Sequence, residues 1–328
     1  MLFSEYMNEW LYGKDGYYKT FKAIGKDGDF YTAVSTSAFF GASIANYIYK
    51  EISKGNLKRD IALIEIGAHQ GYLMGDMIRW LYTKDDSLLN SMRFIIIERQ
   101  DAVIEAQKEY FAKNFGNAVK IEYYKSLSEL SLESAVFVSN EIFDAFACDL
   151  YKDGKIAVVN NHQIDWIDAP LKYVEFAKKH RLRTGEIATG YEDFAKEVAD
   201  VAKSYEFLSF DYGEKYVRND FSIRIYTKHK TYPLFDKEVK LQEHFKKSDI
   251  TYDVNFAHVI EAFERVGAKL ENYETQARAL VRFGIIDILG EYYKVATKAN
   301  YLAQADKVKT LLAPTIMGDR FKLVHFKG

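Results

Sequence analysis

A glycine-containing turn is the first feature of this sequence with the chemistry to bind a ligand. It lies within Ile61–Met77, IALIEIGAHQGYLMGDM, where a short apolar run ends in Glu65 and is followed by Gly67 and Gly71. Apolar residues at helical spacing come next, so the stretch predicts a strand, a tight turn and a helix. Such a turn exposes backbone N–H groups and allows a ligand to approach the backbone closely. The alternative is that Gly71 and Gly75 only let the helix lie close to a strand.

The next predicted strand, Arg93–Glu98, ends in an acidic residue, Glu98, which narrows the choice of ligand. A carboxylate at that position can accept hydrogen bonds from both hydroxyls of a ribose. The glycine spacing is not G-x-G-x-x-G, so the dinucleotide fingerprint is incomplete. Glu65 and Glu98 would together disfavour a phosphate and favour a cationic, phosphate-free cofactor. S-adenosylmethionine (SAM) has a ribose, a sulfonium, an ammonium and no phosphate, so we expect SAM.

Three polar residues interrupt an otherwise apolar and aromatic stretch after another predicted strand, Ala135–Ser139. They are Asn140, Glu141 and Asp144. Burying them without partners would cost free energy, so they require a role. One reading is helix capping by Asn140 or Glu141. The other is a set of acceptors that holds a cationic nitrogen nucleophile, because a planar guanidinium matches carboxylates in a bidentate arrangement.

A further loop, Gly28-Asp29-Phe30-Tyr31-Thr32, is predicted either to cover a ligand pocket or to be a surface connection. Other chemistries find no support in the sequence. The seven histidines are scattered, and H-E-x-x-H, C-x-x-C, the P-loop pattern and G-x-S-x-G are missing. No metal site is therefore predicted.

Composition bounds the class of protein. The 45 Lys and Arg residues nearly balance the 47 Asp and Glu residues, so no global basic field attracts nucleic acid or anionic lipid. The single cysteine, Cys148, excludes an intrachain disulfide. No apolar run is long enough for a membrane span, and the N-terminus, MLFSEYMNEW, resembles neither a secretory signal nor a transit peptide. We therefore expect a cytoplasmic protein.

Strands alternate with helices from residue 61 onward, which predicts an α/β fold with a mostly parallel sheet covered on both faces. In such sheets ligands bind at the carboxyl ends of the strands. The expected strands are Ile61–Ile66, Arg93–Glu98, Val119–Tyr123, Ala135–Ser139, Glu206–Asp211, Lys269–Thr275 and Phe321–Phe326. The expected helices are Tyr72–Tyr82, Asp101–Asn114 and Asp253–Gly267.

The expected domain organisation has an N-terminal helical or lid segment and one large domain. The first covers residues 1–52, with helices near Phe3–Tyr12 and Ala38–Ile52. The second covers 53–328 and carries insertions at about 148–205 and 212–248. The first insertion is predicted to contain a hairpin, Asp149–Ile167, and a helix, Tyr191–Ser204, and to carry substrate specificity. The charges of the second insertion suit a solvated loop.

Several ordered motifs resemble those of the MidA-type SAM-dependent methyltransferases, a bacterial and mitochondrial family. The resemblance runs nearly end to end and includes the opening F-x-x-YM, the GDF-x-T loop, the NE-x-x-DA signature and the DYG motif. In this chain these stand, in that order, at Phe3–Met7, Gly28–Thr32, Asn140–Ala145 and Asp211–Gly213. The cofactor motif corresponds to Glu65–Asp76, and Met317–Lys322 matches a late motif.

This resemblance implies a class I methyltransferase fold, Rossmann-like, with a seven-stranded sheet, SAM as the cofactor and a protein substrate. In at least one relative of the family the substrate is an arginine of a respiratory complex I subunit. Carried over by residue, Gly67, Gly71 and Glu98 would contact SAM beside Glu65. The loop of Gly28, Asp29, Phe30 and Thr32 would close over it. Asn140, Glu141 and Asp144 would face the substrate.

Two departures from the family pattern keep other functions open. The family's cofactor turn usually reads GPGRG, whereas this chain has GAHQG. The family's loop also tends to read TSPE before a serine, whereas this chain has Thr32-Ala-Val-Ser35, with neither proline nor glutamate. One alternative is a SAM-fold assembly or binding protein with weak or no catalysis. A small-molecule methyltransferase is another, and a nicotinamide dehydrogenase is disfavoured by the incomplete fingerprint.

Overall fold

A computed structural model describes residues 1–19, 32–216, 218–227 and 230–328. The chain forms two compact units, each built from three separate segments. Unit 1 consists of Met1–Phe30, Ile142–Ala195 and Tyr212–Arg265, and unit 2 of Tyr31–Glu141, Lys196–Asp211 and Val266–Gly328. Each unit is described separately below. The predicted boundary after residue 52 stays a prediction.

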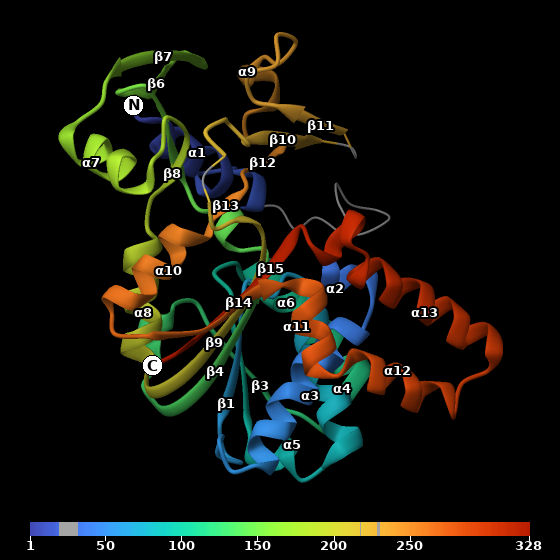
Figure 1. The fold of residues 1–328 in the computed structure, drawn as a ribbon. Helices are drawn as coiled ribbons and strands as arrows, with labels where there is room; N and C mark the ends of the chain where they lie inside the picture. The colour runs from blue at the N-terminus through green and yellow to red at the C-terminus, as the bar shows by residue number, and fades with distance from the viewer. Residues whose placement is uncertain (20–31, 217, 228–229) are drawn as a thin grey trace. The chain divides into compact units, whose positions relative to one another are not determined.

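The centre of unit 2 is a mostly parallel sheet in the order β14-β15-β9-β4-β1-β2-β3 (Figure 1). The neighbours β9, β4, β1, β2 and β3 are parallel, whereas β14 and β15 pair antiparallel. The strands span Ala62–Ile66 (β1), Arg93–Ile97 (β2), Ile121–Tyr124 (β3), Leu132–Asn140 (β4), Ala202–Glu214 (β9), Lys269–Thr275 (β14) and Phe321–Lys327 (β15). The expected α/β fold of the class I methyltransferase type, with its seven-stranded sheet, is thus confirmed, and a two-residue strand, β13 (Val254–Asn255), adds to the end of β9.

The apolar sequence of the central strands explains their position. The strand β1 reads ALIEI and β2 reads RFIII, and nearly every residue of both is buried. Continuous apolar runs of this kind are typical of parallel strands covered by helices on both faces. The helices of unit 2 are α2 (Ala33–Thr36), α3 (Phe39–Ser53), α4 (Tyr72–Lys84), α5 (Leu88–Ser91), α6 (Asp101–Phe115), α11 (Gln276–Phe283), α12 (Ile285–Tyr293) and α13 (Lys298–Leu312).

Two predicted helix boundaries were wrong, and strand pairing explains both. The helix expected over Tyr191–Ser204 ends at Val201 (α8, Tyr191–Val201), because Ala202–Ser204 already pair in parallel with β4. The helix expected from Asp253 begins at Phe256 (α10, Phe256–Arg265), because Val254 and Asn255 pair with the end of β9. In both cases hydrogen bonds to a distant strand override the local helical pattern.

Unit 1 contains two small antiparallel sheets. The first has the order β7-β6-β5-β8, and the second has the order β11-β10-β12. Their bounds are Cys148–Lys152 (β5), Lys155–Asn160 (β6), Gln163–Asp168 (β7), Thr184–Ala188 (β8), Arg224–Thr227 (β10), Lys230–Pro233 (β11) and Asp249–Thr251 (β12). The hairpin predicted over Asp149–Ile167 is therefore present as part of a larger sheet. The second insertion, predicted as loop, contains β10 and β11.

The remaining elements of unit 1 are helical. They are α1 (Phe3–Tyr12), α7 (Leu171–His180), α9 (Leu241–His244), α10, the first part of α8 up to Ala195, and two 3-10 turns at Tyr17–Lys19 and Phe143–Ala145. None of the helices within the described residues has both the length and the apolar character needed to cross a membrane.

Candidate active site

The parallel register of unit 2 brings three predicted site residues to one edge of the sheet. Ile66, the last residue of β1, pairs with Ile97 on β2 and with Ser139 on β4. The next residue on each strand belongs to the predicted site: Gly67, Glu98 and Asn140. We call these three residues, together with the adjoining Glu141, the strand-end cluster. Because the carboxyl ends of parallel strands meet at one edge, the cluster occupies the position where ligands of such sheets bind.

The glycine turn between β1 and α4 adopts a left-handed backbone at three positions. Gly67, His69 and Gly71 have φ values of 73°, 46° and 76°. A Cβ atom on Gly71 would lie 2.9 Å from Cε2 of Phe111 on α6, and a Cβ on Gly75 would lie 2.4 Å from the Tyr110 hydroxyl. The close approach of α6 to α4 therefore explains why glycine occupies both positions. The role of Gly71 in cofactor binding stays a prediction.

Gln107 on α6 contacts this turn, and the sequence-based prediction missed it. It is fully buried, and its Nε2 donates a hydrogen bond to the carbonyl oxygen of His69 at 2.7 Å. Its Oε1 has no hydrogen-bond partner among the described residues. The available sequence signal was weak: Gln107 is the one polar member of the buried stripe of α6, which also contains Val103, Ile104 and Phe111.

Glu65 is buried at the end of β1 and is bonded to the helix that follows the turn. Its Oε2 accepts a hydrogen bond from the backbone N–H of Met74 at 2.8 Å. This N–H belongs to the first turn of α4, so the carboxyl group satisfies one of the otherwise unpaired donors of the helix N-terminus. Burial raises the pKa of Glu65 to about 8, although the Met74 bond acts in the opposite direction. Glu65 therefore has a capping function independent of any ligand.

Glu98 lies directly after β2 and is only partly buried. Its backbone N–H donates to the carbonyl oxygen of Tyr124, which continues the pairing with β3. Its Oε1 accepts from the N–H of Gln100 at 3.0 Å. Burial raises the pKa of Glu98, while the hydrogen bonds from the backbone of Gln100 and Arg99 lower it. The carboxylate is thus held by the chain and still has acceptor capacity for hydroxyl groups.

Asn140 and Glu141 form a connected pair at the end of β4. The Nδ2 of Asn140 donates to Oε1 of Glu141 at 2.9 Å. The Oδ1 of Asn140 is buried and has no hydrogen-bond partner among the described residues. Glu141 has a φ of 54°, and its backbone N–H donates to Phe210 at 2.8 Å. A non-glycine residue in a left-handed conformation is held there at some cost in free energy, and such residues gather at functional sites.

Asp144 lies in unit 1, on the 3-10 turn Phe143–Ala145, and is nearly inaccessible. It accepts a hydrogen bond from the hydroxyl of Tyr212, which also bonds to the hydroxyl of Thr251 at 2.7 Å. Burial raises the pKa of Asp144 to about 6, and the hydrogen bond from Tyr212 and the charge of Arg224 partly offset this rise. Asp144 is therefore part of a local polar network.

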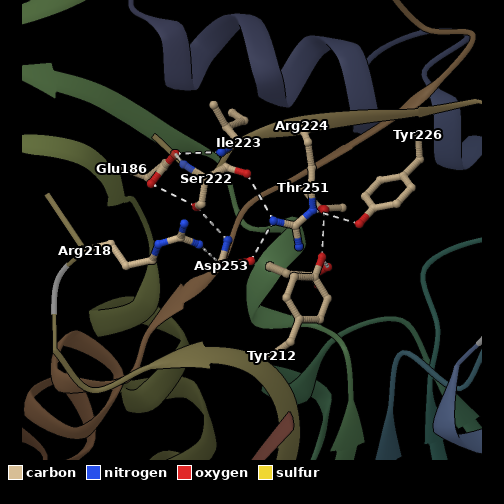
Figure 2. A network of polar contacts seen from close by, with 10 residues as sticks. Glu186, Tyr212, Arg218, Ser222, Ile223, Arg224, Tyr226, Thr251 and Asp253 are labelled. Carbon is tan, nitrogen blue, oxygen red and sulfur yellow. Dashed lines mark hydrogen bonds and ion pairs between the residues drawn. The ribbon is translucent and has the colours of Figure 1, made fainter. Parts of the chain in front are cut away.

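Figure 2 shows the network around Arg224, which the sequence-based prediction did not include. The guanidinium lies over the ring of Tyr212, 4.9 Å from its centroid. Its Nη1 donates to Asp253 at 2.6 Å and to the carbonyl oxygen of Ser222 at 3.1 Å, and its Nε donates to the hydroxyl of Tyr226 at 2.7 Å. We call Arg224 and these partners, together with Asp144, the Arg224 network.

Thr32 caps a short helix of unit 2. Its Oγ1 accepts a hydrogen bond from the N–H of Ser35 at 3.1 Å, at the start of α2. The other predicted loop residues, Gly28, Asp29 and Phe30, lie outside the described residues. Within unit 2, the strand register therefore gathers Gly67, Glu98, Asn140 and Glu141, with Glu65 and Gly71 in the flanking strand and turn.

Comparison with known proteins places the chain in a family. Residues 43–274 match the model of a family described as "Putative S-adenosyl-L-methionine-dependent methyltransferase". Because this match covers more than half of the chain, the protein belongs to that family of SAM-dependent methyltransferases, as the resemblance to the MidA-type enzymes indicated. SAM is the cofactor of the family.

Curated relatives are more distant. The protein arginine methyltransferase NDUFAF7 homolog of Caenorhabditis elegans, a mitochondrial protein, is 24% identical over 280 residues, which are 74% of this chain and 63% of the relative. The human mitochondrial protein arginine methyltransferase NDUFAF7 is 26% identical over 161 residues, 43% of this chain and 36% of the relative. The chain thus matches less than two thirds of the length of these relatives.

Solved structures support the fold. A COG1565 superfamily member from Burkholderia thailandensis, described as a likely methyl transferase bound to S-adenosyl-homocysteine, has a TM-score of 0.84 at 23% identity. The similarity covers 100% of this chain and 88% of that one. A native structure of a COG1565 superfamily protein from the same organism has a TM-score of 0.80 at 22% identity and covers 100% and 87%.

Proposed function

We propose that the protein transfers a methyl group from SAM to the guanidinium of a protein arginine. The observation that carries the proposal is the Asn140–Glu141 pair, which lies at the end of β4 on the same sheet edge as Gly67 and Glu98. The buried Oδ1 of Asn140, unpaired among the described residues, is an acceptor that a bound N–H donor would satisfy. Membership of the family identifies SAM as the methyl donor, and the names of the curated relatives support an arginine substrate.

The residues at this edge suit the cofactor. Glu98 would accept hydrogen bonds from the ribose hydroxyls, and the turn from Gly67 to Gly71 would face the rest of SAM. The predicted closure by Gly28, Asp29, Phe30 and Thr32 is part of the proposal. When bound, SAM supplies an electrophilic methyl group on a cationic sulfur.

The chain's own residues would bind and orient the nucleophile. A free guanidinium has a pKa above about 12 and hardly deprotonates at neutral pH, so its proton must leave as the new N–C bond forms. Glu141 would hold the guanidinium by charge-assisted hydrogen bonds and align one nitrogen, and alignment contributes much of the rate of such displacements. Either Glu141 or Asp144 would receive the proton late in the reaction. The proposed partner is a protein, and a subunit of a complex I-type dehydrogenase is the candidate to test first.

A second candidate function is a SAM-fold assembly or binding protein without catalysis. The specific observation is the GAHQG turn, in which His69 is left-handed and its carbonyl oxygen accepts a hydrogen bond from Gln107. Methylation of a small molecule is a further alternative. Cytoplasmic localisation stays a prediction from the sequence.

The experiment combines binding with transfer. Calorimetry with S-adenosylhomocysteine measures the cofactor site, and incorporation of labelled methyl groups into arginine measures transfer, first with purified complex I-type subunits and then with a cell lysate. We expect Glu141→Gln to lower transfer at least about 100-fold while binding is retained. Glu133→Gln is the matched control, because Glu133 lies exposed on β4, the strand that Glu141 follows.

The outcomes separate the candidate functions. Binding with transfer to arginine that is lost in Glu141→Gln supports the proposal. Undiminished transfer by Glu141→Gln contradicts the assigned role of Glu141. Binding without any transfer favours the assembly protein, and transfer only to small molecules in the lysate favours the small-molecule enzyme.

A further inference from the structure

The helical hairpin of α12 and α13 carries four exposed large hydrophobic residues of unit 2. Ile286, Tyr293, Val295 and Leu302 have exposed fractions of 53%, 62%, 83% and 51%. We call these four residues the hairpin face. They lie within 17 residues of one another in sequence, and Figure 1 shows the two helices running outward from α11 to the turn between them. Several exposed apolar residues on one structural feature mark it as a candidate interaction surface.

The helix α13 has little packing of its own to stabilise it. Of its fifteen residues only Val308 and Leu311 are buried, and both belong to its C-terminal end. None of the residues from Lys298 to Lys307 is buried. Most helical stability in proteins comes from packing of one face, and a short isolated helix is only marginally stable in water. The first part of α13 therefore lacks the covering surface that a helix of this kind normally has.

The exposed face of α13 carries a charge pattern that is complementary to itself. Lys298 and Asp306 are both exposed and stand four residues before and four residues after Leu302. At 3.6 residues per turn, Lys298 lies about 40° to one side of Leu302 around the helix, and Asp306 lies about 40° to the other side. When two copies of α13 pack antiparallel with Leu302 at the centre, Lys298 of each copy meets Asp306 of the other. The contact then has an apolar centre and two ion pairs.

We propose that the hairpin face is a dimerisation surface, and that its occupant is the α13 helix of a second copy of this chain. A two-fold contact uses the same patch on both copies, so it requires a surface that is complementary to itself. The arrangement of Lys298, Leu302 and Asp306 meets this requirement. This inference does not depend on the proposed methyl transfer.

The test is the mass of the purified chain in solution, measured by sedimentation equilibrium and by light scattering after gel filtration. We expect a dimer of twice 37.9 kDa at micromolar concentration. Leu302→Glu should weaken the dimer at least about 100-fold, because it places two carboxylates at the centre of the contact. Circular dichroism should show that the helical content of the variant is kept.

Charge reversal makes the test specific for the antiparallel arrangement. Lys298→Asp and Asp306→Lys should each weaken the dimer, because each creates two like-charge pairs. An equimolar mixture of the two variants should dimerise again, because every pair then joins opposite charges. Lys307→Asp is the control, since Lys307 is exposed on the same helix but outside this face.

Two results would overturn the proposal. One is a monomer at about 100 µM, whatever other protein the hairpin face binds. The other is a dimer that is insensitive to Leu302→Glu and to both charge reversals, which would place the contact elsewhere on the chain.

Discussion

The strand-end cluster of unit 2 is partly exposed, whereas the Arg224 network of unit 1 includes the buried Asp144 and Tyr212, and the two groups are built differently. In the strand-end cluster, the backbone determines where the residues lie, because parallel strands in register place Gly67, Glu98 and Asn140 at one edge of the sheet. In the Arg224 network, contacts between side chains hold the group together. Its members come from separate segments and are joined by hydrogen bonds and an ion pair: Asp144, Tyr212, Arg224 and Asp253. The first cluster should therefore be sensitive to added Cβ atoms, and the second to lost charges.

The largest expected effect is in the Arg224 network. Arg224→Met should lower the free energy of unfolding by about 3 kcal/mol, because it leaves the carboxylate of Asp253 and several hydrogen-bond partners without their buried cation. Arg218→Met is a matched control: Arg218 pairs with the same Asp253 at 3.2 Å, but its side chain is 63% exposed. That change should cost less than about 1 kcal/mol in urea denaturation. Equal effects of the two substitutions would show that burial does not determine the strength of the network.

The glycine turn offers the second comparison, within unit 2. Gly71 and Gly55 have nearly equal φ values, 76° and 77°, but a Cβ on Gly71 meets Phe111 whereas one on Gly55 meets nothing within 4 Å. We expect Gly55→Ala to cost about 1 kcal/mol from backbone strain alone, and Gly71→Ala about 2 kcal/mol. Adding Phe111→Leu should recover part of the larger loss. Equal losses at both glycines would mean that the close approach of α6 is not what requires Gly71.

Glu65 allows a test by pH. Its pKa is raised from 4.5 to about 8 in the folded protein, so the folded state binds the proton more tightly than the unfolded state. Its contribution to stability is therefore fully present below about pH 4.5 and is lost as the pH rises toward 8, by roughly 2 kcal/mol between pH 6 and 8. Glu65→Gln should remove this part of the pH dependence while its side-chain oxygen still accepts from Met74. The measurement is thermal unfolding of the wild type and of Glu65→Gln between pH 6 and 8. An equal loss of stability in the two proteins would refute the raised pKa of Glu65.

The smallest expected effect concerns Tyr212. Tyr212→Phe removes the hydrogen bond to Asp144 and should cost about 1 kcal/mol at pH 7.5. Since that bond favours the ionised carboxyl group, and the pKa of Asp144 is about 6, the cost should be smaller at pH 5. Tyr226→Phe, which removes a hydrogen bond from Arg224 instead, should show no such difference between pH 5 and 7.5. A pH-independent cost for Tyr212→Phe would indicate that Asp144 does not titrate in this range.

The sequence was sufficient for features that depend on local pattern. Buried apolar runs that end in a polar or glycine residue predicted β1, β2 and β4 and the residues that follow them. Because parallel strands end at a common edge, the pattern also predicted that Gly67, Glu98 and Asn140 would gather there. Family membership followed from motifs and is confirmed by the match over residues 43–274.

Only the tertiary structure decided the features that depend on contacts between distant segments. Gln107 had no local sign of its bond to the carbonyl of His69, since the partners are 38 residues apart. Arg224 stood in a segment that read as a solvated loop, and its buried position depends on Tyr212 and Asp253 from other segments. The exposed first part of α13 was equally hidden, because a sequence pattern shows which residues are apolar but not which of them another element covers.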